Sequence, residues 1–268
     1  MKSLAELSAD VGRQLIGVFT DIDDTLTTDG QLPAAAYNAM EQLRDSGLAV
    51  VPITGRPAGW CDLIARLWPV DGVVGENGAF YFHYDRGNRK MCRYYADDVE
   101  SRRDNSERLM ALGDAVLSAV PGASISADQA YRETDLAIDF CEDVTPLDEQ
   151  AIAQIVAVLK EGGATVKVSS IHVNAWFGNY DKLTMTRRFA RDVLGLDIDA
   201  TEKRFIFSGD SPNDGPMFSF FSHSVGVANV SAFADQLELP PTYITVGHGG
   251  AGFTEMANML VAMREGGG

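Results

Sequence analysis

Three aspartates stand close together where an apolar run ends, in the stretch VFTDIDDTLT at residues 18–27. Asp21, Asp23 and Asp24 carry like charges that repel one another, so a purely structural loop gains nothing from clustering them. A divalent cation bound by carboxylate oxygens would remove that repulsion. So would a reaction in which one carboxylate attacks an electrophile and another carries a proton. The stretch therefore indicates metal binding or catalysis.

Other polar groups follow other apolar runs. Thr54 comes after the run at 48–53, Asp210 comes after the run at 204–208, and Lys182 opens an amphipathic segment. In an open α/β sheet, ligands bind beyond the carboxyl ends of the strands. The sequence therefore predicts that acids, a hydroxyl and a cation meet at one edge of a sheet.

The elements that position these groups alternate between strand and helix. Short apolar runs typical of strands covered on both faces lie at 16–20, 48–53, 73–74, 204–208 and 225–227. Amphipathic helices are predicted from Pro33 to Gly47 and at 58–67, 182–194 and 252–264. This order predicts an α/β fold with a doubly wound, Rossmann-like core of parallel strands.

The pattern changes between residues 84 and 178. Two amphipathic helices are predicted there, one opened by Asp104 and Glu107 at capping-box spacing and one opened by Thr145, Pro146 and Asp148. Strand-like runs accompany them at 91–95, 136–140 and 164–168. We predict an α+β cap domain at 84–178, inserted into a core domain made of residues 1–83 and 179–268.

Four segments, taken in order, resemble the four motifs of the haloacid dehalogenase superfamily. They are DIDDT (21–25), PITGR (52–56), the lysine of NYDKLT (179–184) and GDSPND (209–214). The chain is most similar to the phosphatase branch with a large α/β cap, the Cof-type and sucrose-phosphatase-like group called IIB. GENGA at 75–79 also resembles that branch, whereas Asp24 stands where many relatives carry glycine. The ordered agreement of four motifs is far more specific than one DxD.

The resemblance implies a role for each core residue. Asp21 is the nucleophile that forms an aspartyl-phosphate, and Asp23 protonates the leaving alcohol and then activates water. Mg²⁺ is bound by Asp21, by the backbone carbonyl of Asp23 and by Asp210.

Cations must offset the repulsion between a carboxylate and a phosphate, roughly 5 kcal/mol for each charge pair at ~3.5 Å and an effective dielectric of about 20. The resemblance gives this task to Lys182 as well as to Mg²⁺, with Thr54 and Gly55 binding the phosphoryl oxygens. Asn213 and Asp214 support the site by orienting the lysine and the water ligands of the metal.

The rest of the substrate must be recognised by the cap as it closes over the strand ends. The polar candidates are Arg56 in PITGR, Arg132 in YRETD, and His172 and Asn174 in SSIHVNAW. Two of them have structural alternatives. Arg132 can pair with Glu133 or Asp135 on the surface, and His172 can be a hydrogen-bonded residue of a sheet.

The resemblance and the motifs favour a Mg²⁺-dependent phosphatase of a small phosphorylated metabolite, such as a sugar phosphate or a related ester. A sugar phosphomutase uses the same residues with a hydroxyl as acceptor in place of water. A phospho-accepting receiver domain shares the acids, the threonine and the lysine, but it is much shorter than this chain. A glycosyltransferase with DID as its metal-binding motif leaves Thr54 and Lys182 unexplained.

The composition restricts location and partners. The formal net charge of −16 argues against a nucleic-acid partner, because affinity for phosphate backbones comes from clustered Lys and Arg. No apolar run approaches the roughly 20 residues of a membrane span, and the N-terminus lacks the apolar segment of a signal peptide. The three cysteines form no CxxC pair, and their odd number suits a reducing compartment. We expect a cytoplasmic monomer or homodimer that binds a small-molecule phosphate ester.

Overall fold

The computed structural model describes residues 1–169 and 171–266, and its central feature is a six-stranded sheet. In spatial order the strands are β1 (Lys2–Ser3), β13 (Tyr243–Ile244), β12 (Ser224–Gly226), β11 (Phe205–Gly209), β2 (Gly17–Thr20) and β3 (Ala49–Pro52). All neighbouring pairs in this sheet are parallel. The predicted Rossmann-like core is therefore confirmed.

The two faces of the sheet bury different apolar clusters. Val18 and Phe19 are successive residues of β2, so their side chains point to opposite faces. Val18 joins one core cluster and Phe19 joins the other. Both faces are covered, which explains why the strand reads as a continuous apolar run.

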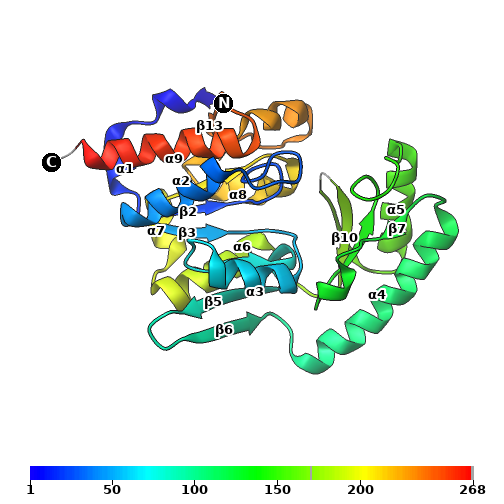
Figure 1. Cartoon of the computed structure of the whole chain (residues 1–268). Helices are drawn as coiled ribbons and strands as arrows, with labels where there is room; N and C mark the ends of the chain where they lie inside the picture. The colour runs from blue at the N-terminus through cyan, green and yellow to red at the C-terminus, as the bar shows by residue number, and fades with distance from the viewer. Residues whose placement is uncertain (170, 267–268) are drawn as a thin grey trace.

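Helices cover both faces of the core sheet (Figure 1). The first cluster receives side chains from α2 (Ala34–Asp45), α3 (Ala58–Leu67) and α9 (Gly249–Glu265), and the second receives them from α6 (Lys182–Phe189), α7 (Ile198–Thr201) and α8 (Gly215–Phe220). The remaining core segments are α1 (Ala9–Gln14) and the short helical turns η1 (Leu4–Glu6), η4 (Ala190–Leu194), η5 (Glu202–Arg204), η6 (Pro212–Asp214) and η7 (Ala228–Gln236). No helix within residues 1–169 and 171–266 is both long and apolar enough to cross a bilayer.

A second, three-stranded sheet continues the core beyond β3. It consists of β4 (Val73–Gly75), β5 (Phe80–Asp85) and β6 (Lys90–Tyr95), paired antiparallel in that order, with the turn η2 (Glu76–Gly78) between the first two strands. Phe80 and Phe82 of β5 belong to the first core cluster. The hairpin therefore crosses the boundary predicted at residue 84, and we propose that the cap begins after Tyr95.

The cap is built from a four-stranded antiparallel sheet and two helices. The strand order is β7 (Ser124–Ile125), β8 (Leu136–Asp139), β10 (His172–Trp176) and β9 (Thr165–Val168); the helices are α4 (Val99–Ala119) and α5 (Glu149–Glu161), and the turn η3 (Gln129–Tyr131) precedes β8. Figure 1 shows α4 and α5 on the side of this sheet that faces away from the core. Val173 and Ala175 pack toward those helices, so His172 and Asn174 point toward the core.

One helix start was predicted wrongly. Asp104 and Glu107 lie inside α4, and the N-cap is Asp98, whose carboxylate accepts a hydrogen bond of 2.8 Å from the Ser101 N–H. An aspartate side chain can accept the free backbone N–H three residues later and so cap a helix. A segment with two such aspartates therefore offers two possible helix starts. The second predicted cap, Asp148, is correct, since it accepts from Ala151 N–H at the start of α5.

Candidate active site

The predicted chemistry-bearing groups meet at the carboxyl ends of the core strands. Asp21 follows β2, and its N–H donates to the Ser208 carbonyl of β11 at 2.9 Å, which fixes the start of the loop. Thr54 follows β3, Asp210 follows β11, and Lys182 is the first residue of α6. All four side chains are buried, although they come from segments far apart in the chain.

Lys182 links two of the acids. Its Nζ donates to Asp21 Oδ1 at 2.6 Å and to Asp214 Oδ1 at 2.9 Å. Burial lowers the pKa of Lys182, but Asp21 and Asp214 outweigh that effect and hold the pKa above its ordinary value. The other oxygen of Asp214 accepts the Asp210 N–H at 3.2 Å. Asp214 therefore contacts both the lysine and the backbone of Asp210, and the supporting role predicted for Asn213 and Asp214 stays a prediction.

Asp21, Asp210 and Asp214 form a compact acidic cluster. One carboxylate oxygen from each lies within 4.8 Å of the others, and all three residues are buried. Burial and the neighbouring carboxylates raise the pKa of Asp210 to about 9. Burial likewise raises the pKa of Asp21 to about 8, against the opposing effect of Lys182. When all three acids are ionised beside one lysine, they leave an excess of negative charge, and buried carboxylate oxygens are the donor set that fits a hard divalent cation.

The loop that carries Asp21 is held in shape by local hydrogen bonds. Asp24 has φ 55°, in the left-handed region that aspartate tolerates better than most residues. Its N–H donates to Thr27 Oγ1 at 2.9 Å, and the Thr25 hydroxyl donates to Asp210 at 3.4 Å. Asp24 therefore takes part in shaping the turn.

Asn229 holds the same loop from outside, and no motif or spacing in the sequence singles it out. Its Nδ2 donates to the Asp24 carbonyl at 2.9 Å, and its Oδ1 accepts the Gly249 N–H at 3.0 Å. Gly249 is the first residue of α9. The loop is thus tied to the N-terminus of the last helix, a contact between residues more than two hundred positions apart.

Thr54 and Gly55 present donors toward the same place. The Thr54 hydroxyl oxygen accepts the Arg56 N–H at 3.0 Å, and no described residue accepts from the hydroxyl. The N–H groups of Asp23 and Gly55 likewise donate to no acceptor among the described residues. A Cβ at Gly55 would lie 3.2 Å from Asn77 Oδ1, so a larger residue would have to displace that amide. Free donors at the strand ends are of the kind that binds an oxyanion, and phosphate binding by Thr54 and Gly55 stays a prediction.

Asp23 does not join the acidic cluster with its carboxylate. Arg56 Nε donates to both Asp23 oxygens, at 2.9 and 3.2 Å, and Nη2 lies 2.9 Å from Oδ1. Burial lowers the pKa of Arg56, but Asp23 more than offsets this and raises it. A guanidinium that binds both oxygens fixes the direction of the carboxylate. The predicted metal contact through the Asp23 backbone carbonyl stays a prediction.

Glu142 of the cap completes this arrangement, and sequence reasoning missed it. Its Oε1 accepts from Arg56 Nη2 at 3.0 Å, and its Oε2 lies 2.9 Å from His172 Nε2. The close approach of the His172 ring, together with Arg56, lowers the pKa of Glu142 to about 2. The Asp139 carboxylate holds the turn that presents Glu142, since it accepts the N–H groups of residues 141, 142 and 143.

The other cap candidates also face the site but are already engaged within the protein. Asn174 Nδ2 donates to Asp135 at 3.1 Å. Arg132 donates to Asp128, to Asp135 and to the Gly55 carbonyl, and its side chain is 1 % exposed. The predicted pairing with Asp135 therefore exists, but it is buried rather than on the surface. Substrate contact by Arg132 stays a prediction.

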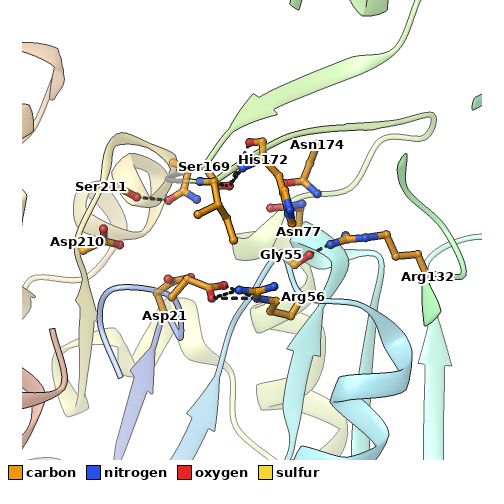
Figure 2. A pocket seen from close by; sticks show the side chains of 13 residues that line it. Asp21, Gly55, Arg56, Asn77, Arg132, Ser169, His172, Asn174, Asp210 and Ser211 are labelled. Atoms are coloured by element: carbon orange, nitrogen blue, oxygen red, sulfur yellow. Dashed lines mark hydrogen bonds and ion pairs between the residues drawn. The ribbon is translucent and has the colours of Figure 1, made fainter. Parts of the chain in front are cut away.

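These residues lie around a narrow cavity between core and cap. Its lining consists of Asp21, Asp23, Gly55, Arg56, Asn77, Arg132, Ser169, Ile171, His172, Asn174, Asp210, Ser211 and Asn213. Figure 2 shows His172 and Asn174 approaching from the cap, opposite Asp21 and Arg56 of the core. Asn213 accepts from the Ser211 hydroxyl at 2.8 Å, while Asp214 contacts the lysine. The cavity is small, strongly polar and closed over by the cap.

Comparison with known proteins gives consistent results. The family described as haloacid dehalogenase-like hydrolase matches residues 18–101. A phosphoglycolate phosphatase of Haloarcula marismortui is 27% identical over 221 residues, covering 81% of this chain and 86% of that protein. The crystal structure of Thermoplasma acidophilum 0175 covers 92% of this chain and 98% of its own, with a TM-score of 0.68 and 16% identity. The sucrose-phosphatase of Synechocystis sp. PCC6803, solved with sucrose and phosphate, covers 92% and 98%, with a TM-score of 0.62 and 18% identity.

Proposed function

We propose that the chain, which is similar to haloacid dehalogenase-like hydrolases over residues 18–101, is a Mg²⁺-dependent phosphatase that releases phosphate from a small phosphorylated metabolite. The observation that carries this proposal is the buried Lys182, which bridges Asp21 and Asp214 inside an acidic cluster at the strand ends. A lysine and a cation there would bind the phosphoryl group, and the cap above would bind the rest.

Asp21 is the nucleophile in this proposal. Its Oδ1 is held by Lys182, so the second carboxylate oxygen is left to attack phosphorus. A new O–P bond forms, the ester O–P bond breaks, and the leaving oxygen takes a proton from Asp23. In the second step Asp23 accepts a proton from water, the water oxygen bonds to phosphorus, and the Asp21–phosphorus bond breaks to release inorganic phosphate.

The negative charge on the phosphoryl group is met by cations and hydrogen-bond donors. Asp21 and Asp210, with the Asp23 carbonyl, would hold Mg²⁺, which supplies positive charge to the phosphoryl oxygens when bound. Lys182 supplies a second positive charge, and Thr54 and Gly55 supply hydrogen-bond donors. Asp214 is placed to keep Lys182 and Asp210 in position rather than to bind substrate.

Arg56 has a positioning role in this scheme. It fixes the Asp23 carboxylate on one side and binds Glu142 of the cap on the other. The closed cap therefore contributes to the alignment of the acid–base group, and it excludes bulk water from the cavity.

The first prediction is the activity itself. Purified protein with Mg²⁺ is expected to release inorganic phosphate from p-nitrophenyl phosphate, and faster from at least one metabolite. The panel includes 2-phosphoglycolate, glycerol phosphate, a hexose phosphate and sucrose phosphate, because the relatives span short and sugar-based esters. Formation of a second phosphorylated sugar in place of inorganic phosphate would favour the phosphomutase alternative. No turnover of any ester with several divalent metals would contradict both.

The second prediction concerns recognition by the cap. Asn174→Ala and His172→Ala are each expected to lower kcat/KM for the preferred metabolite by about tenfold or more, since a lost hydrogen bond leaves a buried partner unsatisfied. Turnover of p-nitrophenyl phosphate should change much less, because its leaving group offers few polar contacts. Lys167→Ala is the matched control: Lys167 lies opposite Asn174 on β9 and is exposed. Equal losses on both esters would contradict recognition by these side chains.

A further inference from the structure

Glu76 is a fully buried carboxylate that the proposed reaction does not use. It directly follows β4, in the core. Its oxygens accept the N–H of Ala58, the first residue of α3, at 2.9 Å. They also accept the N–H groups of three successive cap residues, Glu133 at 3.0 Å, Thr134 at 2.7 Å and Asp135 at 3.2 Å, and the hydroxyl of Thr134. One core carboxylate thus binds a whole turn of the cap.

The backbone around Glu76 is shaped for this contact. Glu76 and Asn77 have φ values of 42° and 57°, a left-handed conformation that residues other than glycine seldom adopt. Gly78 follows with φ 105°, and a Cβ there would lie 2.1 Å from the Asp181 carbonyl oxygen. Strained conformations of this kind persist only where surrounding contacts determine them, and they concentrate at functional sites.

The segment that Glu76 binds also places the polar wall of the cavity. Asp135 accepts from Asn174 at 3.1 Å, from Arg132 at 2.9 Å and from Asn77 at 3.5 Å. Arg132 in turn donates to the carbonyl of Gly55 at 2.9 Å. Asn77, Arg132 and Asn174 all line the cavity, and Figure 2 shows them together on the cap side of Gly55. Glu76 therefore contacts Asp135, and Asp135 contacts the side chains of Arg132 and Asn174 that would meet the leaving group.

We propose that Glu76 is a positioning residue that fixes the position of cap residues 133–135 on the core. Through them it controls recognition of the leaving group without touching it. The inference rests on the proposed function, since a leaving group exists only for a phosphate ester. The contacts join core to cap, so they can form in the closed arrangement and must break if residues 133–135 move away with the cap. Recognition by Arg132 and Asn174 would then depend on Glu76.

The test compares Glu76→Gln with a matched control, Glu255→Gln. A glutamine side chain in place of Glu76 would present one amide N–H₂ to backbone N–H groups, so at least one set of hydrogen bonds is lost. Glu255 also accepts two backbone N–H groups, from Val246 and Gly247, but within the core. Thr134→Val, which removes only the hydroxyl donor, is a milder second variant in case Glu76→Gln does not fold.

For Glu76→Gln we expect KM for the preferred metabolite to rise about tenfold, the equivalent of about 1.4 kcal/mol, with kcat/KM for p-nitrophenyl phosphate within about threefold of the unaltered protein. Thr134→Val should show a smaller change in the same direction, and Glu255→Gln none. Equal losses on both esters, or an unchanged KM, would overturn the proposal, because a general structural role affects both esters alike.

Amide hydrogen exchange provides a readout that does not need turnover. With Mg²⁺ and inorganic phosphate present, the amides of residues 133–135 should be protected in the unaltered protein and in Glu255→Gln. In Glu76→Gln they should exchange faster, while amides of β2 remain protected. Unchanged protection at 133–135 would overturn the proposal even if phosphatase activity were present. If Glu76→Gln lost protection at residues 133–135 but the unaltered protein hydrolysed no ester, the role of Glu76 in positioning the cap would be supported and the phosphatase function would be rejected.

Discussion

Asp21→Asn is expected to lower phosphate release by about 10⁴-fold or more, the scale of loss seen when a covalent nucleophile is removed. The amide has nearly the shape of the carboxylate, so Lys182 keeps an oxygen acceptor at position 21 and its 2.9 Å contact with Asp214. The fold should therefore remain. Initial rates of phosphate release and thermal unfolding of the same sample measure the two effects.

The covalent intermediate separates this variant from its neighbour. After rapid quenching with substrate, mass spectrometry should detect a phosphoryl group on Asp21 in the unaltered protein and none in Asp21→Asn. Asp23→Asn should still form the intermediate, but slowly, because proton transfer is worth about 10² to 10⁴ in each step. Asp29→Asn, an exposed residue of the same loop, is the control. Near-normal turnover by Asp21→Asn would mean that the assigned nucleophile is wrong.

The core of the site could be predicted because its residues stand at strand ends. Gly17–Thr20 and Phe205–Gly209 are apolar runs covered on both faces, and such runs are read directly from the sequence. The rule that parallel strands end at one edge then brings Asp21, Thr54 and Asp210 together. No information about distant contacts was needed for that step.

The contacts between core and cap could not be predicted in the same way. Glu142, Asn229 and the cap partners of Glu76 act across long separations in the chain, and none of them lies in a periodic pattern that marks its partner. Arg132 illustrates the difficulty. An arginine among acids suggests a solvated ion pair, but the fold buries it between two aspartates and a backbone carbonyl.

The limits of the cap were uncertain for a related reason. Residues 91–95 have the composition of a strand, and composition does not state which sheet the strand joins. β6 pairs with β5, whose phenylalanines pack into the core, so the hairpin belongs to the core side. The helix α4 then begins at Val99, directly after the hairpin, rather than in the middle of its own amphipathic stretch.

Removal of divalent metal is expected to abolish phosphate release and to make stability fall as pH rises. Burial raises the pKa of Asp210 to about 9 and of Asp21 to about 8, above the ordinary value of 3.8. Groups whose pKa is higher in the folded state bind more protons there than in the unfolded chain. Their stabilising contribution is complete below about pH 4 and is lost as pH rises toward 9.

The midpoint temperature of thermal unfolding of the chelated protein should therefore decrease as the pH is raised from 6 to 9. The loss for each titrating group is at most about 1.4 kcal/mol per pH unit, or roughly 2 to 4 °C for a chain of this size. Mg²⁺ binds the deprotonated carboxylates, so the increase that it produces should be larger at pH 9 than at pH 6. Glu76, whose pKa burial raises to about 7, changes stability in the same direction, so the comparison needs a variant of the cluster itself.

Asp210→Asn provides that comparison. The amide removes one buried charge from the cluster, so the chelated variant should lose less stability toward pH 9 than the chelated unaltered protein. The variant should also lose most of the Mg²⁺-dependent increase, because a ligand is missing, and its phosphate release should fall with it. Two outcomes would contradict this account. One is a midpoint of thermal unfolding that does not depend on pH in either chelated protein, and the other is a Mg²⁺-dependent increase in that midpoint that is larger at pH 6 than at pH 9. Either would show that the three acids do not repel one another in the folded protein. The cluster would then have no electrostatic need for a cation.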